Sequence, residues 1–218
     1  MPETIGTVVS PADGKLVEIV EVDDPIIGAA VRFGIFLSVF NVHANRIAMP
    51  GRVVRVRYRP GKFLNALRSE STKENENMDV ELECPEIGGR IVRIRQITGQ
   101  FARRIVCWAR VGDVLQRGEM FGMIKLGSRT ELVIPRDEAL EIVAQVGEKV
   151  CAGSTVSSTP TRQETSFDAG GVANVVDARK RRLRSSCNRD CRQYGIAGLD
   201  ARVQTVCRRF VDLWRHVV

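Results

Sequence analysis

The chain has 218 residues, 44% of them hydrophobic, and a formal net charge of +7 at pH 7. This length fits one domain, or one domain with an appendage, and the hydrophobic content is sufficient for a buried core. No segment reaches the roughly 18 uninterrupted apolar residues of a membrane-spanning helix, so we expect no transmembrane segment in this sequence.

The positive charge is concentrated near the end of the chain. Residues 160–218 carry a net charge of +6, whereas residues 1–159 carry only +1. Residues 157–171 are rich in Ser, Thr, Pro and Gly, which is typical of a linker. Apolar residues at helical spacing between 203 and 217 indicate a basic amphipathic helix, which either lies in a membrane interface or has no specific task. We therefore divide the chain into a nearly neutral domain, 1–158, and a basic extension, 159–218.

Strand-like patterns begin close to the start of the chain. From Thr7 to Val22, two β-rich runs flank a Pro-Ala-Asp-Gly turn that contains Asp13. Residues 31–42 are almost continuously apolar, as in a strand buried on both faces, and His43 follows them. His43 is one of only two histidines in the chain.

The middle of the domain combines arginine-rich strands with a polar loop. In residues 52–59, Val54, Val56 and Tyr58 alternate with three arginines, which predicts a half-buried strand with a basic outer face. Residues 90–97 repeat this less regularly, and the two basic faces are either solvated or placed against anionic lipid head groups. We expect one or two helical turns at 62–68 and an exposed, mobile loop at 69–77.

Two glycine-containing turns share one pattern, at 111–118 and at 146–153. Each has Val-Gly-acidic, then a valine, then a glycine, and the glycines are expected to supply positive φ angles. Such turns occur in small β domains such as biotinyl and lipoyl carriers. The predicted fold is mostly β, a β-sandwich or barrel-sandwich hybrid with few short helices, α+β overall.

The six cysteines show no framework spacing, so we expect reduced thiols. Cys187 and Cys191 are four residues apart, but no second pair completes a zinc set, and we expect no metal site.

Gly127 and Ser128 stand between two strand-like runs, at 121–126 and 131–134. By itself Gly-Ser is a common turn dipeptide. With His43 and Asp13, however, the chain has a hydroxyl, an imidazole and a carboxylate at turns or strand ends, which are the groups needed to activate a serine.

Together with their flanks, these segments resemble the phosphatidylserine decarboxylase family, in particular its short bacterial and archaeal branch, which includes archaetidylserine decarboxylases. The resemblance covers roughly residues 7 to 158 and contains several ordered motifs. The matching pieces are SPADGK at 10–15, FNVHANR at 40–46, YRPGKFLNA at 58–66, ARRIVCWA at 102–109 and GEMFGMIKLGSRTELVIP at 118–135.

Family members are proenzymes that cut themselves before a serine, which becomes a covalent pyruvoyl group. The resemblance places the cut between Gly127 and Ser128, giving a β chain of residues 1–127 and an α chain from 128. It implies that His43 is the base and that Asp13 orients its ring, while the charge of Arg46 suits a substrate phosphate or carboxylate. Many relatives have a second histidine where this chain has Arg46, so either His43 serves both cutting and decarboxylation or another residue takes one step.

The resemblance also implies a pyruvoyl-dependent carboxy-lyase that converts phosphatidylserine to phosphatidylethanolamine. We expect an anionic phospholipid at a membrane surface as partner, a heterodimer of the two cleaved chains that is able to dimerise further, and no nucleic acid. The expected location is peripheral, on the cytoplasmic side of the cell membrane. The choice between diacyl and ether-linked substrates stays open.

Two other functions are compatible with the residues. One is a non-catalytic carrier module, either biotinyl- or lipoyl-like, for which Lys125 and Lys149 are both poorly placed, or a phosphoryl carrier that uses His43. The other is an uncleaved, inactive relative of the decarboxylases.

Overall fold

The computed structural model describes residues 5–38, 40–67, 70–100, 104–124, 128–137 and 140–160. All of them belong to one compact unit, Met1–Gly171. The expected linker and amphipathic helix of the extension lie outside the described residues. The elements are β1 (Val8–Val9), β2 (Gly14–Asp24), β3 (Gly28–Leu37), β4 (Ala44–Arg46), β5 (Gly51–Arg59), α1 (Ser71–Glu74), β6 (Asn77–Cys84), the 3-10 turn η1 (Pro85–Ile87), β7 (Arg90–Ile97), β8 (Ile105–Cys107), β9 (Val114–Leu115), β10 (Met120–Ile124), β11 (Ser128–Pro135), β12 (Leu140–Ile142), β13 (Lys149–Val150) and β14 (Val156–Pro160).

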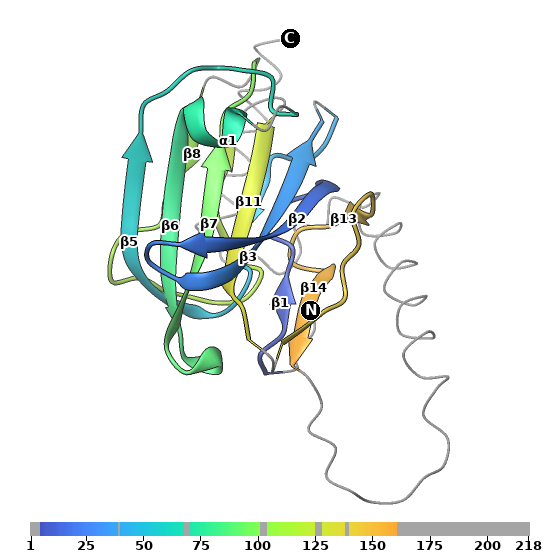
Figure 1. Ribbon diagram of the computed structural model, residues 1–218. Coiled ribbons are helices and arrows are strands. Elements are labelled where there is room, and N and C mark those ends of the chain that lie inside the picture. Colours follow the sequence, from blue (N-terminus) through green and yellow to red (C-terminus); the bar gives the residue numbers. More distant parts are fainter. Residues whose placement is uncertain are drawn as a thin grey trace, which may run out of the picture. The chain divides into compact units, whose positions relative to one another are not determined.

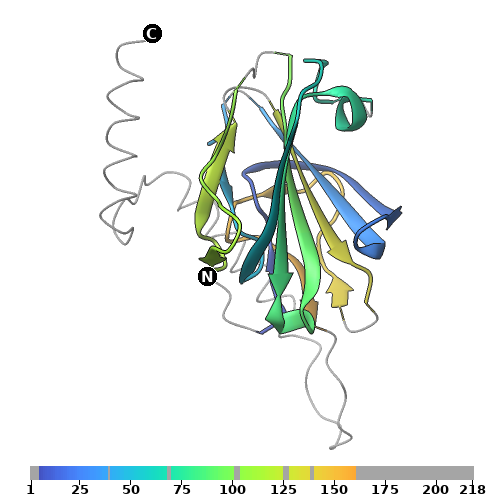
Figure 2. The ribbon, with the colours of Figure 1, turned by 90° about the vertical axis from the view of Figure 1, so that its left-hand side faces the viewer.

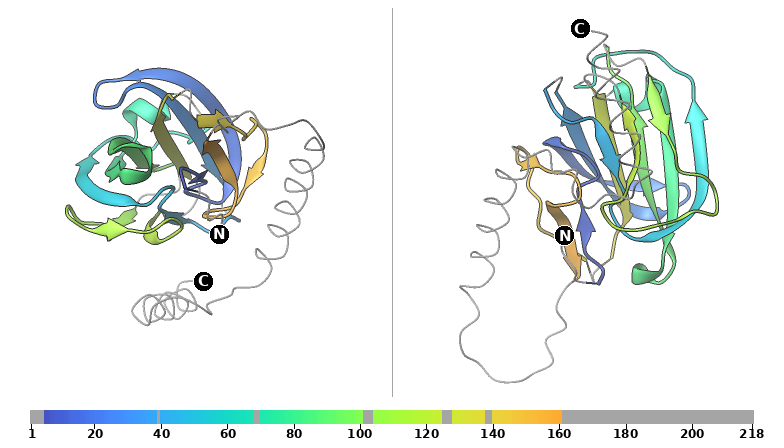
Figure 3. Two further views of the ribbon diagram at one scale, coloured as in Figure 1. Left: turned by 90° about the horizontal axis from the view of Figure 1, so that it is seen from below. Right: turned by 180° about the vertical axis from the view of Figure 1, so that it is seen from behind.

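Strands form three sheets, which confirms the predicted mostly β fold with few short helices. The largest has eight strands in the order β13-β2-β3-β11-β7-β6-β5-β9, with β11 between β3 and β7 (Figure 1). This sheet curls, as the view from below shows (Figure 3). The order of the second sheet is β4-β10-β8, and its lime-coloured strands form a separate layer in Figure 2. The third sheet has the order β1-β14-β12.

The two repeated turns have the conformation predicted from their glycines. The φ angles are +97° at Gly112 and +77° at Gly118, and +92° at Gly147 and +73° at Gly153. A side chain is disfavoured at such angles, so glycine is the residue that lets the chain reverse here. Each repeat also contains a two-residue strand, β9 in the first and β13 in the second.

The central strand β11 is buried along its whole length and separates two different environments. On its inner face Leu132 and Ile134 join the main apolar core, to which β3 contributes Phe33 and Ile35. On its outer face Arg129 and Glu131 are 2% and 0% exposed. Side chains alternate across a strand, so one run of eight residues supplies both faces.

Opposite charges cover the outer face and pair across the strands. The Arg129 Nε donates to Glu131 Oε1 at 2.9 Å, and α1 adds the Thr72 hydroxyl, which donates to the same oxygen at 2.8 Å. We call the whole set the outer-face ladder. Its charged members are Glu18, Asp24, Arg32, Arg59, Asp79, Glu81, Arg93, Arg95, Arg129 and Glu131.

The ladder overturns the solvated or lipid-facing surface expected at 90–97. Arg93 is 4% exposed and donates to Glu81 at 3.1 Å, and Arg95 donates to Asp79 at 2.5 Å. Carboxylates on the neighbouring strand β6 therefore neutralise Arg93 and Arg95 of β7. In β5, by contrast, Arg52, Arg55 and Arg57 are exposed, as expected.

Three local expectations are wrong. A register shift between Val53 and Arg55 turns Val54 outward and Val53 inward, so the simple alternation fails where the strand bulges. The predicted exposed loop at 69–77 contains the helical turn α1, whose Ser71 and Thr72 are buried. No helix forms in the described part of 62–68.

Cys84 and Cys107 are free, as expected. Cys151, however, is disulfide-bonded, so the expectation of reduced thiols fails at this position. Among the described residues, no helix has the length and apolar character needed to cross a bilayer.

Candidate active site

Ser128, the residue expected to become the pyruvoyl group, is the first residue of β11 and points to the inner face of the large sheet. Its exposure is 0%, and its Oγ has no hydrogen-bond partner within the described part of the chain. Gly127, the other residue of the expected cut, lies outside the described residues. A buried hydroxyl costs free energy when it is left unpaired, so its retention here is compatible with a group reserved for chemistry.

The strand segment around His43 contacts the chain on both sides of the expected cut. Upstream, the amide of Ile124 donates to the His43 carbonyl at 3.1 Å, which extends the pairing of β10 with β4. Downstream, Asn45 Nδ2 donates to Thr130 Oγ1 at 2.9 Å. One short segment therefore holds both flanks of the Gly127–Ser128 bond.

We infer from the strand directions that His43 and Ser128 lie at the same level. We call one end of the large sheet the reaction edge. The strands β3, β5 and β7 end there, and β6 and β11 begin there. The strand β10 must run towards this edge, because only three residues separate Ile124 from Ser128. Its antiparallel partner β4 therefore runs away from it, in the same direction as β11. His43 and Ser128 each lie two residues nearer the reaction edge than the contacting pair Asn45 and Thr130.

The turn with Asp13 lies beside the end of β4. The amide of Arg46 donates to the Pro11 carbonyl at 2.8 Å, and the amide of Ala152 donates to Asp13 Oδ1 at 2.9 Å. Burial raises the pKa of the Asp13 carboxyl above its ordinary value, and the Ala152 amide and the Arg46 charge only partly oppose this. The structure thus brings Asp13 and Arg46 together at the His43 segment, while the bond of Asp13 to the imidazole ring stays a prediction.

Arg46 has structural partners as well as a place at the site. Its Nη1 donates to the Gly118 carbonyl at 2.8 Å, and its charge acts on Asp13. It ties the repeated turn at 111–118 to β4. Its expected role in binding substrate also stays a prediction.

Sequence reasoning missed three polar residues at this site, Asn45, Gln96 and Thr130. All three are 0% exposed, and Gln96 Nε2 donates to Asn45 Oδ1 at 2.8 Å. Gln96 carried a usable signal, since it continues the inner-face alternation of Val92 and Ile94 with a polar side chain.

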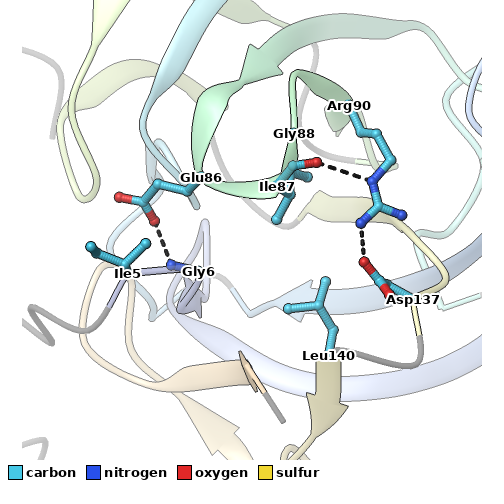
Figure 4. A pocket seen from close by; sticks show the side chains of 8 residues that line it. All are labelled: Ile5, Gly6, Glu86, Ile87, Gly88, Arg90, Asp137 and Leu140. Atoms are coloured by element: carbon cyan, nitrogen blue, oxygen red, sulfur yellow. Dashed lines mark hydrogen bonds and ion pairs between the residues drawn. The ribbon is translucent and has the colours of Figure 1, made fainter. Parts of the chain in front are cut away.

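A surface pocket lies at the opposite edge of the sheet, around η1 (Figure 4). Its polar groups pair with one another: the Gly6 amide donates to Glu86 at 2.8 Å, and Arg90 forms an ion pair with Asp137. We therefore do not assign the reaction to it. Among the described residues, no group of three or more metal-ligating side chains gathers.

Known proteins match the same part of the chain. Residues 1–158 match the family model of phosphatidylserine decarboxylase. A phosphatidylserine decarboxylase proenzyme of Rhodopirellula baltica is 99% identical over 156 residues, which are 72% of this chain and 65% of that protein. Proenzymes of the same name from Carboxydothermus hydrogenoformans and Desulfotalea psychrophila are 42% and 41% identical over 158 residues, 72% of each chain. The chain thus spans about two thirds of the length of these relatives, and the match does not favour the carrier alternative. The chain belongs to the phosphatidylserine decarboxylase family.

Proposed function

We propose that this chain is a proenzyme that cuts itself between Gly127 and Ser128 and then decarboxylates phosphatidylserine to phosphatidylethanolamine. The observation that carries the proposal is the buried Ser128 hydroxyl, unpaired within the described part of the chain, at a point where the His43 segment holds both flanks of the bond. Family membership supports the reaction, and the burial of Ser128 beside the His43 segment supports the site.

The first chemical step belongs to the chain's own residues. Ser128 Oγ attacks the carbonyl carbon of Gly127 while His43 accepts the hydroxyl proton, and the Asp13 carboxylate stabilises the resulting imidazolium. The C–N bond then breaks, the nitrogen of Ser128 takes the proton, and an ester joins the two residues. Loss of the Ser128 Cα proton breaks the ester's Cβ–O bond, and the Gly127 carboxylate leaves. Water then replaces the nitrogen at residue 128 and releases ammonia, which leaves the pyruvoyl ketone.

The pyruvoyl group supplies an electron sink for the carbanion that forms when carbon dioxide departs. The enclosed position of Ser128 fits such a group, because burial keeps water from a reactive carbonyl. In this proposal His43 returns a proton to the decarboxylated carbon, and Arg46 binds the head group's phosphate or carboxylate.

The reaction edge is the side of the molecule that we infer meets the membrane. Phe40 and Val42, next to His43, are 95% and 52% exposed, and Leu67 on the neighbouring loop is 58% exposed. The cations of Lys73 and Arg104 are exposed near the same edge. Apolar side chains beside cations suit the boundary of an anionic bilayer, where the head group of a lipid substrate lies.

The decisive experiment is intact-mass analysis of the Ser128→Ala variant beside the wild type. The wild type should yield two chains, with a carbonyl on the smaller that hydroxylamine traps, whereas Ser128→Ala should remain one chain without decarboxylase activity. Ser158→Ala is a matched control, because Ser158 is also 0% exposed with an unpaired hydroxyl within the described part of the chain. It should cut normally.

A wild-type chain that folds but stays whole would contradict the proposal and return the carrier or the inactive relative as the better reading. Phosphatidylethanolamine formed by Ser128→Ala would contradict the mechanism.

A further inference from the structure

The strand β4, which directly follows His43, is joined to β11, the strand that begins with Ser128, by a fully buried amide. Asn45 donates to Thr130 Oγ1 at 2.9 Å and accepts from Gln96 Nε2 at 2.8 Å. Thr130 and Gln96 are themselves register partners on β11 and β7. We call these three residues the Asn45 bridge.

The absence of a side chain at Gly122 leaves the space that Gln96 occupies. A Cβ added to Gly122 on β10 would lie 2.9 Å from Gln96 Nε2 and 2.5 Å from the Val106 carbonyl. Gly122 is also the register partner of Asn45. Glycine at this point therefore lets β10, β4 and the large sheet approach closely enough for the hydrogen bonds to form.

Stability alone does not account for these residues. Gln96 Oε1 is buried without a hydrogen-bond partner within the described part of the chain. An unpaired buried acceptor costs about 1–3 kcal/mol, and replacing all three residues together by apolar side chains of the same shape would cost little stability. A polar group that lowers stability in a core can be retained because it specifies one packing arrangement of the strands among several.

The arrangement that it specifies is the register of β4 against β11. A shift of β4 by one residue would replace the Asn45 amide by Ala44 or Arg46 and remove the amide that pairs with Thr130 and Gln96. The same shift would move His43 by about 3.3 Å along the strand relative to Ser128. A displacement of about 1 Å in a reacting group can cost about a hundredfold in rate.

Resting on the proposed self-cleavage, we propose that Asn45, Thr130 and Gln96 are positioning residues that set the level of His43 against Ser128. They act through the two strands and do not touch the bond that is cut. Loss of the bridge slows cutting even in molecules that remain folded.

The test compares Thr130→Val, Thr130→Ser and Thr72→Val in the full chain. Valine keeps the shape of threonine but removes the acceptor, whereas serine keeps the acceptor and loses a methyl group. Thr72→Val is the matched control, since it removes a buried hydroxyl that contacts β11 from the outer face. The rate of cutting is followed on denaturing gels during cell-free synthesis, and stability is measured in the Ser128→Ala background.

We expect Thr130→Val to cut at least about tenfold more slowly, a loss of about 1.4 kcal/mol of transition-state stabilisation. Thr130→Ser and Thr72→Val should stay within about threefold of the wild type. A residue needed only for packing would give the reverse order at position 130, with valine tolerated better than serine, and that order would overturn the inference. A wild type that stays whole overturns the proposed function and the bridge together, whereas equal rates in a wild type that cuts and in Thr130→Val overturn the bridge alone.

Discussion

Gly122 illustrates at the residue scale how closely the strands of the site approach one another. Its missing side chain leaves room for Gln96 and for the Val106 carbonyl, and the second of these is backbone that cannot rotate away. Gly28, at the β2–β3 turn, offers a contrast, because it has a φ of +79° but nothing within 4 Å of an added Cβ.

We predict that Gly122→Ala destabilises the uncut fold by about 1–3 kcal/mol, since overpacking forces the strands apart. Cutting should slow in parallel because Gln96 is displaced. Gly28→Ala should cost only about 1 kcal/mol from backbone strain and cut at the normal rate. Denaturant unfolding in the Ser128→Ala background and gel assays of cutting measure the two effects, and normal cutting by Gly122→Ala would disagree with this account.

Asp13 gives a second prediction at this scale. In Asp13→Asn the amide oxygen can still accept from Ala152, so the fold should persist, but the negative charge that stabilises an imidazolium at His43 is lost. We expect cutting to slow at least about tenfold. The exposed Asp23 provides the control, and Asp23→Asn should cut like the wild type; an unimpaired Asp13→Asn would remove Asp13 from the mechanism.

At the residue scale, the sequence indicates the family but does not show which side chains contact one another. Ser128, His43 and Asp13 became candidates because the motifs around them resemble a family, and their roles stay predictions. Asn45 and Thr130 could not, because their value lies in a contact between residues 85 positions apart, and a single sequence does not show which polar residues meet.

At the scale of elements, the outer-face ladder makes the fold sensitive to acid. Burial alone would raise the pKa of Glu18, but hydrogen bonds and charge from Arg129 and Arg32 together hold it below 4.5. Burial alone would also raise the pKa of Asp24, but the hydrogen bonds from Arg93 and from the amides of residues 26 and 27 outweigh this effect and hold the pKa below 3.8. A carboxyl with a lowered folded pKa stabilises the protein above its unfolded pKa, and this stabilisation is lost as the pH falls through the folded value.

We therefore predict that the free energy of unfolding decreases steadily as the pH falls below about 4.5, with up to about 1.4 kcal/mol per pH unit for each extra proton bound by the unfolded chain. Glu18→Gln should lower stability at neutral pH and flatten the acid slope. The exposed Glu141→Gln should leave both unchanged. Denaturant titrations between pH 3 and pH 7 measure the slopes, and identical slopes for wild type and Glu18→Gln would speak against the ladder.

The same elements show where strand patterns mislead. Alternation correctly identified β5 and β7 as strands with an arginine face, but an arginine looks the same in sequence whether it faces water or a carboxylate. In β7 the arginines face carboxylates, because Asp79 and Glu81 on the adjacent strand β6 pair with them. The polar loop at 69–77 misled in the same way, since Thr72 is buried against Glu131 and does not face solvent.

For the whole molecule, the cut would divide one sheet between two chains. The strands β2 to β10 precede Gly127, and β11 follows it, yet β11 pairs with β3 along eight residues and with β7 along five. The strand β14 likewise pairs with β1. We predict that the two chains co-elute in size-exclusion chromatography under native conditions and separate only under denaturing ones. Release of the smaller chain in native buffer would contradict the observed pairing.

The inferred membrane side gives a prediction for the molecule as a whole. Phe40→Ser combined with Leu67→Ser should weaken binding to vesicles rich in anionic phospholipid by about tenfold, since each change removes an exposed apolar anchor at the reaction edge. Val114→Ser is the control, because Val114 is 62% exposed but lies near the start of β5, at the other edge. Co-sedimentation measures the binding, and an equal loss in both proteins would assign no special role to the reaction edge.

The position of β11 between β3 and β7 has a further consequence for the lifetime of the proposed two-chain enzyme. The precursor folds as a single polymer, so every strand finds its neighbours at a fixed effective concentration. After the cut, two chains that heat has separated must find each other by diffusion. Meanwhile the unpaired edges of β3 and β7 are exposed and favour aggregation. Thermal inactivation should therefore be a one-way process whose half-life is governed by the barrier to separation, and no equilibrium midpoint will describe it.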